Sequence, residues 1–225
     1  GGVTTLQILG MLQRTQFRRA APGGTLAAHY VAEASRLAFA DRGKYLADPD
    51  FVDVPVSDLL DQSYLRQRAR LISRTQPMAS VVPGTPPKRR AHNNIVGASH
   101  ELPSTTHFSI VDKRGNAVSM TSSVENVFGS RLMVGGFLLN NQLTDFSFAP
   151  EADGALVANR VQPGKRPRSS MSPFIVLDRQ NRFRMAVGSP GGSRIIAYVA
   201  KTLIGVIDWR PDIQSAIDLP NLTNR

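Results

Sequence analysis

Cysteine is absent from the 225 residues of this chain. The chain therefore has no disulfide, no thiol nucleophile and no cysteine metal site. Only four histidines are present, and their spacing does not match a zinc-binding motif. Because proteins of reducing and of oxidising compartments can both lack cysteine, this absence does not indicate a location.

A long hydrophobic run is missing as well, since spanning a bilayer takes about 18 or more apolar residues. The most apolar window, residues 195–209, is interrupted by Lys201 and Asp208. No targeting signal is visible, and the chain starts at Gly1 without an initiator methionine. We therefore expect no membrane span in this chain, and we expect the chain to be a piece of a longer protein.

Acidic residues are outnumbered, with 17 Asp and Glu against 27 Lys and Arg, for a net charge of +10. Residues 1–104 hold 13 basic and 8 acidic groups, and residues 105–225 hold 14 and 9, so each part contributes +5. A nucleic-acid-binding arm would concentrate such an excess, and aromatics for base stacking make up only 7% of the chain. The densest basic cluster is 88–90, inside a proline-rich stretch. We predict a dispersed basic surface and no nucleic-acid partner.

Helical patterns occur in three places. Residues 25–45 predict a long helix, and a second helix is expected from Ser57, as its N-cap, to about Leu71. An apolar helix is expected from about residue 194 to residue 207. Five prolines in residues 74–104 predict a mobile linker of about 30 residues, a length that is usually functional or disordered.

Strand patterns follow that linker. Residues 106–112 and 117–123 flank a turn at 113–116, and residues 174–177 and 183–187 flank a turn at 178–181. These alternations predict two hairpins. With the helices, they indicate a layered sheet-and-helix domain whose 41% hydrophobic content can fill one sizeable core.

Thr105 lies where the linker meets the first strand. A threonine there is most often structural, because threonine favours strands. If the chain were cut before Thr105, however, one residue would carry both a hydroxyl nucleophile and a free α-amine. That amine titrates at a pKa of roughly 7.7–8.0 and can take up the hydroxyl proton.

A glycine-rich turn at residues 188–193 precedes the last predicted helix. Most such turns only connect elements, but adjacent glycines at a helix start can aim backbone N–H groups at an anion or a developing oxyanion. The polar clusters 140–145 and 165–173 are most simply loops. As ligand groups, they offer a carboxylate for an ammonium and hydroxyls for a carboxylate.

Together, these segments resemble the γ-glutamyltranspeptidases, which are N-terminal nucleophile hydrolases. The resemblance rests on residues 105–109, on 139–142 with 145–147, on 165–173 and on 188–195, in the family's order and spacing. Upstream, 40–42 and 48–51 resemble the end of that family's large subunit. The resemblance covers nearly the whole chain.

The resemblance implies a role for each of ten residues. Thr105 matches the nucleophile, exposed when the precursor cleaves itself between Ser104 and Thr105, and Ser123 matches a residue, usually threonine, that orients it. Contacts to the substrate α-amino group match Glu125, Gln142 and Asp145. Contacts to the α-carboxylate match Ser169 and Ser170, and the oxyanion hole matches Gly191 and Gly192.

The resemblance also implies an α+β fold, namely a four-layer αββα sandwich that is incomplete in this chain. Residues 1–104 would be the C-terminal part of the large subunit with its linker, and residues 105–225 the N-terminal part of the small catalytic subunit. The expected substrates are glutathione and related γ-glutamyl amides, with water, an amino acid or a peptide as acceptor, and with no metal or organic cofactor. The expected location, periplasmic or secreted, also follows from the resemblance alone.

The chain differs from the family pattern in two respects, and two alternative functions remain open. The family's carboxylate-binding arginine lies upstream of this chain, and residues 146–162 differ from the family's lid loop. A cephalosporin (glutaryl) acylase is the closest rival, but its substrate lacks the α-amine that Asp145 would bind. The other rival is a non-catalytic basic binding protein, whose affinity for nucleic acid would fall steeply with salt.

Overall fold

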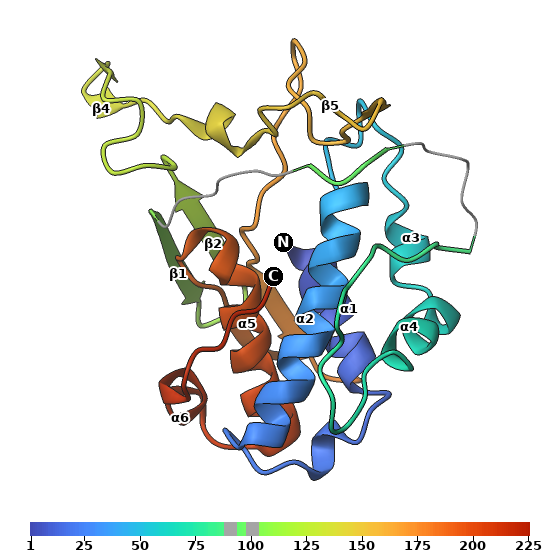
Figure 1. Cartoon of the computed structure of the whole chain (residues 1–225). Coiled ribbons are helices and arrows are strands. Elements are labelled where there is room, and N and C mark those ends of the chain that lie inside the picture. The colour runs from blue at the N-terminus through green and yellow to red at the C-terminus, as the bar shows by residue number, and fades with distance from the viewer. Residues whose placement is uncertain (88–93, 98–103) are drawn as a thin grey trace.

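A layer of helices packs against a pair of β-hairpins (Figure 1). The computed structural model describes residues 1–87, 94–97 and 104–225. The helical segments are α1 (Gly2–Leu12), η1 (Phe17–Arg19), α2 (Thr25–Tyr45), α3 (Val56–Leu59), α4 (Gln62–Ala69), η2 (Gln142–Asp145), η3 (Gly192–Arg194), α5 (Ile195–Ile204), η4 (Gly205–Trp209) and α6 (Ile213–Asp218). The strands are β1 (Thr105–Val111), β2 (Ala117–Ser123), β3 (Met133–Val134), β4 (Phe137–Leu138), β5 (Glu151–Ala152), β6 (Ala155–Leu156), β7 (Phe174–Leu177) and β8 (Phe183–Val187). This mixture of helices and antiparallel strands confirms the α+β class.

The long helix expected over residues 25–45 is confirmed as α2. Its small and apolar side chains pack with α1, α4 and α5 in the largest buried cluster of the described chain. The sequence patterns did not predict α1, although this helix buries Ile8, Met11 and Leu12 in that cluster. Fully burying such side chains contributes roughly 1.5–3 kcal/mol each.

The helix expected from Ser57 to Leu71 is wrong in its start and its continuity. Two short helices, α3 and α4, stand in its place, and Pro55 rather than Ser57 is the N-cap of α3. Asp61 interrupts the pattern because its carboxylate accepts hydrogen bonds from the backbone N–H groups of Ser63 (2.8 Å) and Tyr64 (3.1 Å). These bonds cap α4 while Asp61 itself keeps an extended backbone.

Both predicted hairpins are confirmed. β1 pairs with β2 in register from Thr105↔Ser123 to Val111↔Ala117, and β7 pairs with β8. β1 begins at Thr105 itself, one residue before the predicted start. β2 lies beside β8, where the Ser119 hydroxyl donates to the Val187 carbonyl oxygen (3.2 Å), so the two hairpins are neighbours.

The C-terminal apolar helix is confirmed as α5, which continues as the π-helical segment η4. α5 lies between the two layers, since Ile196 and Ala200 pack with α1 and α2 while Val199 and Leu203 pack against β8. In residues 1–87, 94–97 and 104–225, no helix combines the length and apolarity that crossing a bilayer requires.

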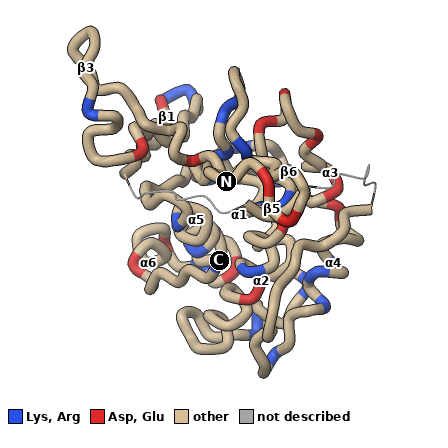
Figure 2. The backbone as a smooth tube through the Cα atoms, turned by 45° about the horizontal axis from the view of Figure 1, so that its top comes forward, with Lys and Arg blue, Asp and Glu red and all other residues tan. Residues whose placement is uncertain are grey.

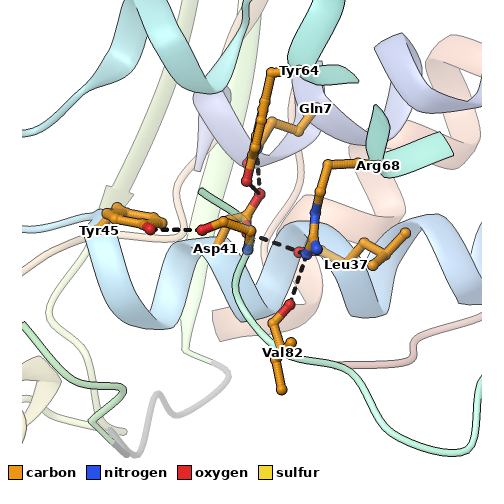
Figure 3. Close-up of polar contacts among 8 residues, drawn as sticks. Gln7, Leu37, Asp41, Tyr45, Tyr64, Arg68 and Val82 are labelled. Carbon is orange, nitrogen blue, oxygen red and sulfur yellow. Dashed lines mark hydrogen bonds and ion pairs between the residues drawn. The ribbon is translucent and has the colours of Figure 1, made fainter. Parts of the chain in front are cut away.

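A buried carboxylate, Asp41 of α2, organises the helical layer (Figure 3). It accepts hydrogen bonds from the Gln7 side chain (2.9 Å), from the Tyr64 hydroxyl (2.7 Å) and from the backbone N–H of Gly84 (2.8 Å). The Arg68 guanidinium forms an ion pair with it at 3.2 Å. α1, α2 and α4 are thereby joined to residue 84 through one charged group.

The prediction of a mobile linker is wrong for residues 74–87. The Tyr45 hydroxyl donates to the Gly84 carbonyl oxygen (2.6 Å), and Arg68 donates to the Val82 carbonyl oxygen (3.0 Å). Nearer its start, the backbone N–H of Met78 donates to the Glu33 carboxylate (2.6 Å). These bonds hold the segment on the helices although it has no regular secondary structure. The rest of the predicted linker lies mostly outside the described residues, as does the basic cluster 88–90.

An ion pair joins the two parts of the chain. The Asp48 carboxylate, 4% exposed, accepts hydrogen bonds from the backbone N–H (2.8 Å) and the guanidinium (2.8 and 3.0 Å) of Arg166. This arrangement holds the pKa of Asp48 well below its usual 3.8, chiefly through the hydrogen bonds from Arg166. Residues before and after position 104 are therefore held together by contacts that do not depend on the intervening segment.

Candidate active site

The structure brings all ten predicted site residues to two adjoining cavities that share Thr105 and Ser123. The smaller cavity is lined by Thr105, Ser123, Glu125, Gln142, Asp145, Ser169, Ser170, Met171, Gly192 and Ile195. The other is lined by Ser104, Thr105, Thr106, Ser122, Ser123, Val124, Pro190 and Gly191. These residues come from five separate segments of the chain.

Ser123, at the end of β2, contacts both sides of the Ser104–Thr105 bond. Its hydroxyl donates to the carbonyl oxygen of Ser104 (2.8 Å) and accepts from the Thr105 hydroxyl (3.4 Å) and the backbone N–H of Glu125 (2.9 Å). The direction of each bond follows from the partners, because a carbonyl oxygen only accepts and an N–H only donates. One donor and two acceptor positions are thus all used, which fixes the Ser123 hydroxyl.

The β1–β2 register explains this proximity. Thr105 and Ser123 are directly paired across the two strands, so their Cα atoms face each other at the open end of the hairpin. Glu125 follows with a backbone φ of +75°, in the left-handed region that non-glycine residues rarely adopt. This sharp turn directs the Glu125 N–H at Ser123 and leaves Glu125 only 4% exposed in the cavity lining.

Two acidic residues and an amide form one part of the lining of the smaller cavity, called here the acidic side. The Gln142 side chain donates to the Glu125 carboxylate (3.4 Å), and Asp145 follows at the end of η2, 4% exposed. The cluster expected to be a simple loop thus contains a 3₁₀ turn. Its carboxylates suit a substrate ammonium.

Ser169 and Ser170 contribute hydroxyl groups to another part of the same lining, called here the hydroxyl side. Arg42, in the last turn of α2, donates to the Ser170 Oγ (2.7 Å), and both residues are buried. The guanidinium of Arg168 donates in turn to the backbone carbonyl oxygen of Arg42 (3.2 Å), near the C-terminal end of α2. Hydroxyl donors beside a buried cation suit a carboxylate.

The glycine-rich turn joins β8 to η3 and α5. Gly191 has φ +137° and Gly192 has φ +57°, conformations that a side chain would strain. Both glycines lie on cavity linings, one on each cavity. A turn of this kind can present backbone N–H groups to a developing oxyanion.

His107, two residues after Thr105, contacts hydroxyl groups of its own hairpin. Its ring nitrogens lie 2.9 Å from the Thr121 Oγ1 and 3.1 Å from the Ser109 Oγ, and burial lowers its pKa. Neither cavity lining includes His107. Among the residues that the structure describes, no three His, Asp or Glu side chains gather as a metal site would require.

The family model described as gamma-glutamyltranspeptidase matches residues 1–225. The chain belongs to the γ-glutamyltranspeptidase family.

Members of this family include relatives of similar sequence over almost the whole chain. Identity is 38% over 229 residues with a glutathione hydrolase proenzyme of Pseudomonas sp. (strain A14), covering 98% of this chain and 38% of that protein. It is also 38% over 229 residues with the glutathione hydrolase proenzyme of Escherichia coli (strain K12), covering 98% and 37%. The chain thus spans about two fifths of the length of these curated relatives.

The fold also resembles that of a solved structure. A cephalosporin acylase from Bacillus halodurans superposes with a TM-score of 0.80 at 25% identity, over 99% of this chain and 37% of that one.

Two residues near the site were assigned no role by sequence reasoning. Arg42 belongs to the segment 40–42, which carried the resemblance to the γ-glutamyltranspeptidase family but no function. Asn159 is a polar residue beside the apolar pair Val157 and Ala158, and it is fully buried between Asp145 and Arg168. A polar residue in an apolar stretch is the signal that could have identified it.

Proposed function

We propose that this chain is the junction of a γ-glutamyltranspeptidase precursor and carries its catalytic threonine. The contact of the Ser123 hydroxyl with the scissile carbonyl, beside a cavity lined by both acidic and hydroxyl groups, supports this proposal most strongly. In this proposal residues 1–104 end the large subunit and residues 105–225 begin the small one. The complete protein would form the four-layer αββα sandwich, of which this chain supplies part.

Maturation would start with an attack by the Thr105 Oγ on the carbonyl carbon of Ser104. The new C–O bond forms as the C–N bond breaks, and the proton of the Thr105 hydroxyl ends on the released amine. The Ser123 hydroxyl stabilises the oxyanion that develops on the Ser104 oxygen. Water then hydrolyses the ester, which leaves a Ser104 carboxylate and a Thr105 with both hydroxyl and α-amine free.

The same hydroxyl would next attack the γ-carbonyl of glutathione or a related γ-glutamyl amide. The Thr105 α-amine takes the proton and passes it to the leaving amine. Backbone N–H groups of Gly191 and Gly192 would stabilise the tetrahedral oxyanion, at roughly 3–4 kcal/mol per donor in comparable sites. Water, an amino acid or a peptide then accepts the γ-glutamyl group from the Thr105 ester.

The amino-acid head of the substrate would lie between the two sides of the smaller cavity. Glu125, Gln142 and Asp145 face the α-ammonium in this arrangement, and Ser169 and Ser170 donate to the α-carboxylate. Side-chain and backbone groups fill every role in the proposed reaction, which requires no metal or organic cofactor.

Family membership also supports proposals about processing and location. The relatives that match are named proenzymes, which supports self-cleavage into two subunits. We propose a periplasmic or secreted location for the complete protein, which the usual location of bacterial members of the family supports. Lys and Arg positions are scattered and interspersed with Asp and Glu (Figure 2), which favours an enzyme over a basic nucleic-acid-binding protein.

A glutaryl acylase is the second candidate, because a cephalosporin acylase shares the fold. Its acyl group has no α-ammonium, so the buried Asp145 beside Glu125 and Gln142 favours the γ-glutamyl substrate. The test uses the full-length proenzyme and its Thr105→Ala variant. Wild-type protein should yield two chains split before Thr105 and should prefer a γ-glutamyl anilide to a glutaryl anilide. Normal cleavage of the variant would contradict the self-processing step, and a glutaryl preference would establish the acylase.

A further inference from the structure

Asn159 is a fully buried residue in the segment that follows β6. Its side-chain Nδ2 donates to the backbone carbonyl oxygen of Asp145 (2.8 Å), and its Oδ1 accepts from the backbone N–H of Arg168 (3.0 Å). Its own carbonyl oxygen accepts from the N–H of Ser147 (2.9 Å). The partners dictate which side-chain atom is nitrogen and which is oxygen, because a carbonyl only accepts and an N–H only donates.

The two loops that this amide joins both contribute to the lining of the smaller cavity. Asp145 ends the 3₁₀ turn η2 on the acidic side, and Arg168 immediately precedes Ser169 and Ser170 on the hydroxyl side. A single asparagine side chain therefore bridges the two loops directly. A shift of either loop would break a buried hydrogen bond and leave a desolvated polar group.

The hydroxyl side has its own anchor in the helical layer. Arg168 donates to the backbone carbonyl oxygens of Arg42 (3.2 Å) and Gly43 (3.4 Å) at the end of α2. Arg42 donates to the Ser170 Oγ (2.7 Å). The hydroxyl side is thus fixed to the end of α2, and Asn159 links the acidic side to it through Arg168.

An α-amino acid carries its ammonium and carboxylate on one carbon, so the separation of these charges is fixed. A site that binds both must hold its two sides at the matching separation before the substrate arrives, or lose binding energy in ordering them. We propose that Asn159 is a positioning residue that sets this separation, and that it thereby selects substrates carrying both groups. This inference rests on the proposed γ-glutamyl function.

Three anilides separate this role from a general loss of structure. The γ-glutamyl anilide carries both groups, the glutaryl anilide only the carboxylate, and the 4-aminobutanoyl anilide only the ammonium. In Asn159→Ala, a substrate with one charged group can still settle on one side, whereas a substrate with two cannot satisfy both. We expect kcat/KM to fall at least about tenfold for the γ-glutamyl anilide and at most about threefold for each of the others.

The measurement uses processed full-length enzyme, with rates normalised to the amount of small subunit that begins at Thr105. Leu59→Ala is the matched control, since Leu59 is fully buried in the cluster around Tyr45 and Tyr64 and does not line either cavity. It should lower stability and leave the ratio of the three substrates unchanged. Equal losses on all three substrates in Asn159→Ala, or no loss, would overturn the positioning role.

Asn159→Asp provides a second variant if the alanine protein does not fold. Its carboxylate still accepts from the Arg168 N–H but no longer donates to the Asp145 carbonyl oxygen, so the same order of losses is expected. Failure of the proposed function is recognised separately, in the wild-type enzyme. There, equal rates on the three anilides would show that neither charge of the amino-acid head is used.

Discussion

The side-chain hydroxyl of Ser123 donates a 2.8 Å hydrogen bond to the carbonyl oxygen of Ser104. The same hydroxyl accepts from the Thr105 hydroxyl, so a nucleophile and the carbonyl that it would attack share one partner. The paired ends of β1 and β2 hold this arrangement in place. Preorganised donors at a developing oxyanion are among the largest contributors to catalysis.

Ser123→Ala should therefore slow self-cleavage of the full-length proenzyme by about 100-fold, the effect of losing one oxyanion donor. Ser123→Thr keeps the hydroxyl and should cleave at close to the wild-type rate. A time course of subunit formation after expression, followed by gel and mass spectrometry, measures both. Ser119→Ala removes a hydroxyl from the same strand that contacts Val187 instead, and should cleave normally. Wild-type cleavage in Ser123→Ala would contradict the role.

Asp145→Ala should weaken recognition of the substrate ammonium. Charge-assisted hydrogen bonds contribute roughly 1.5–3 kcal/mol, so kcat/KM for a γ-glutamyl anilide should fall at least about tenfold, or about 1.4 kcal/mol. A glutaryl anilide has no ammonium and should lose much less. Steady-state kinetics on the two substrates give the comparison, and similar losses on both would mean that Asp145 serves folding only.

Gly191→Ala should damage the proposed oxyanion hole. Alanine is strained at φ +137°, and its Cβ would lie 3.0 Å from the Tyr198 ring, so the turn must move. Backbone strain of this kind costs about 1–3 kcal/mol, and we expect kcat to fall about 100-fold as the N–H groups shift. Gly136→Ala, at φ +87° in the β3–β4 turn with no atom within 4 Å, is the control for strain alone. An equal loss of kcat in both variants would argue against a specific role for Gly191.

Acid should weaken the contact between Asp48 and Arg166. The pKa of Asp48 in the folded protein lies below its usual 3.8. As the pH falls towards and below 3.8, the unfolded chain therefore binds more protons at this carboxylate than the folded chain does. The stability from this pair is therefore present above about pH 4 and is lost on acidification towards the folded-state pKa. Asp48→Asn removes the titrating group, so its urea midpoint should fall less between pH 6 and pH 3 than that of the wild type.

Asp50→Asn is the matched control for that measurement. Asp50 contacts the same guanidinium (2.7 Å), but its side chain is 72% exposed, and exposed ion pairs contribute little. Its acid response should follow the wild type. If the urea midpoint of Asp48→Asn also falls as much as that of the wild type, the Asp48–Arg166 pair makes no pH-dependent contribution to stability.

Elements with strong local signals were predictable from sequence. In the β1–β2 hairpin, Gly115 takes φ +85° and the Asp112 carboxylate accepts from the N–H groups of Arg114 (2.8 Å) and Asn116 (2.9 Å), all within five residues. α2 was equally predictable because small and apolar side chains recur along its sequence at helical spacing. In contrast, the break between α3 and α4 depends on Asp61 capping a new helix, which competes with continuing the old one.

The amino-acid sequence by itself determined the hairpins, α2 and α5, and, through family resemblance, the ten candidate site residues. Only the tertiary structure decided that these residues line two adjoining cavities, that Asp41 fixes residue 84, and that Asn159 joins the two sides of the smaller cavity. The reason is the range of the interactions. Turns, caps and helical faces are settled between near neighbours in the chain. Buried polar contacts between distant segments form only when packing excludes water and brings matching donors and acceptors together.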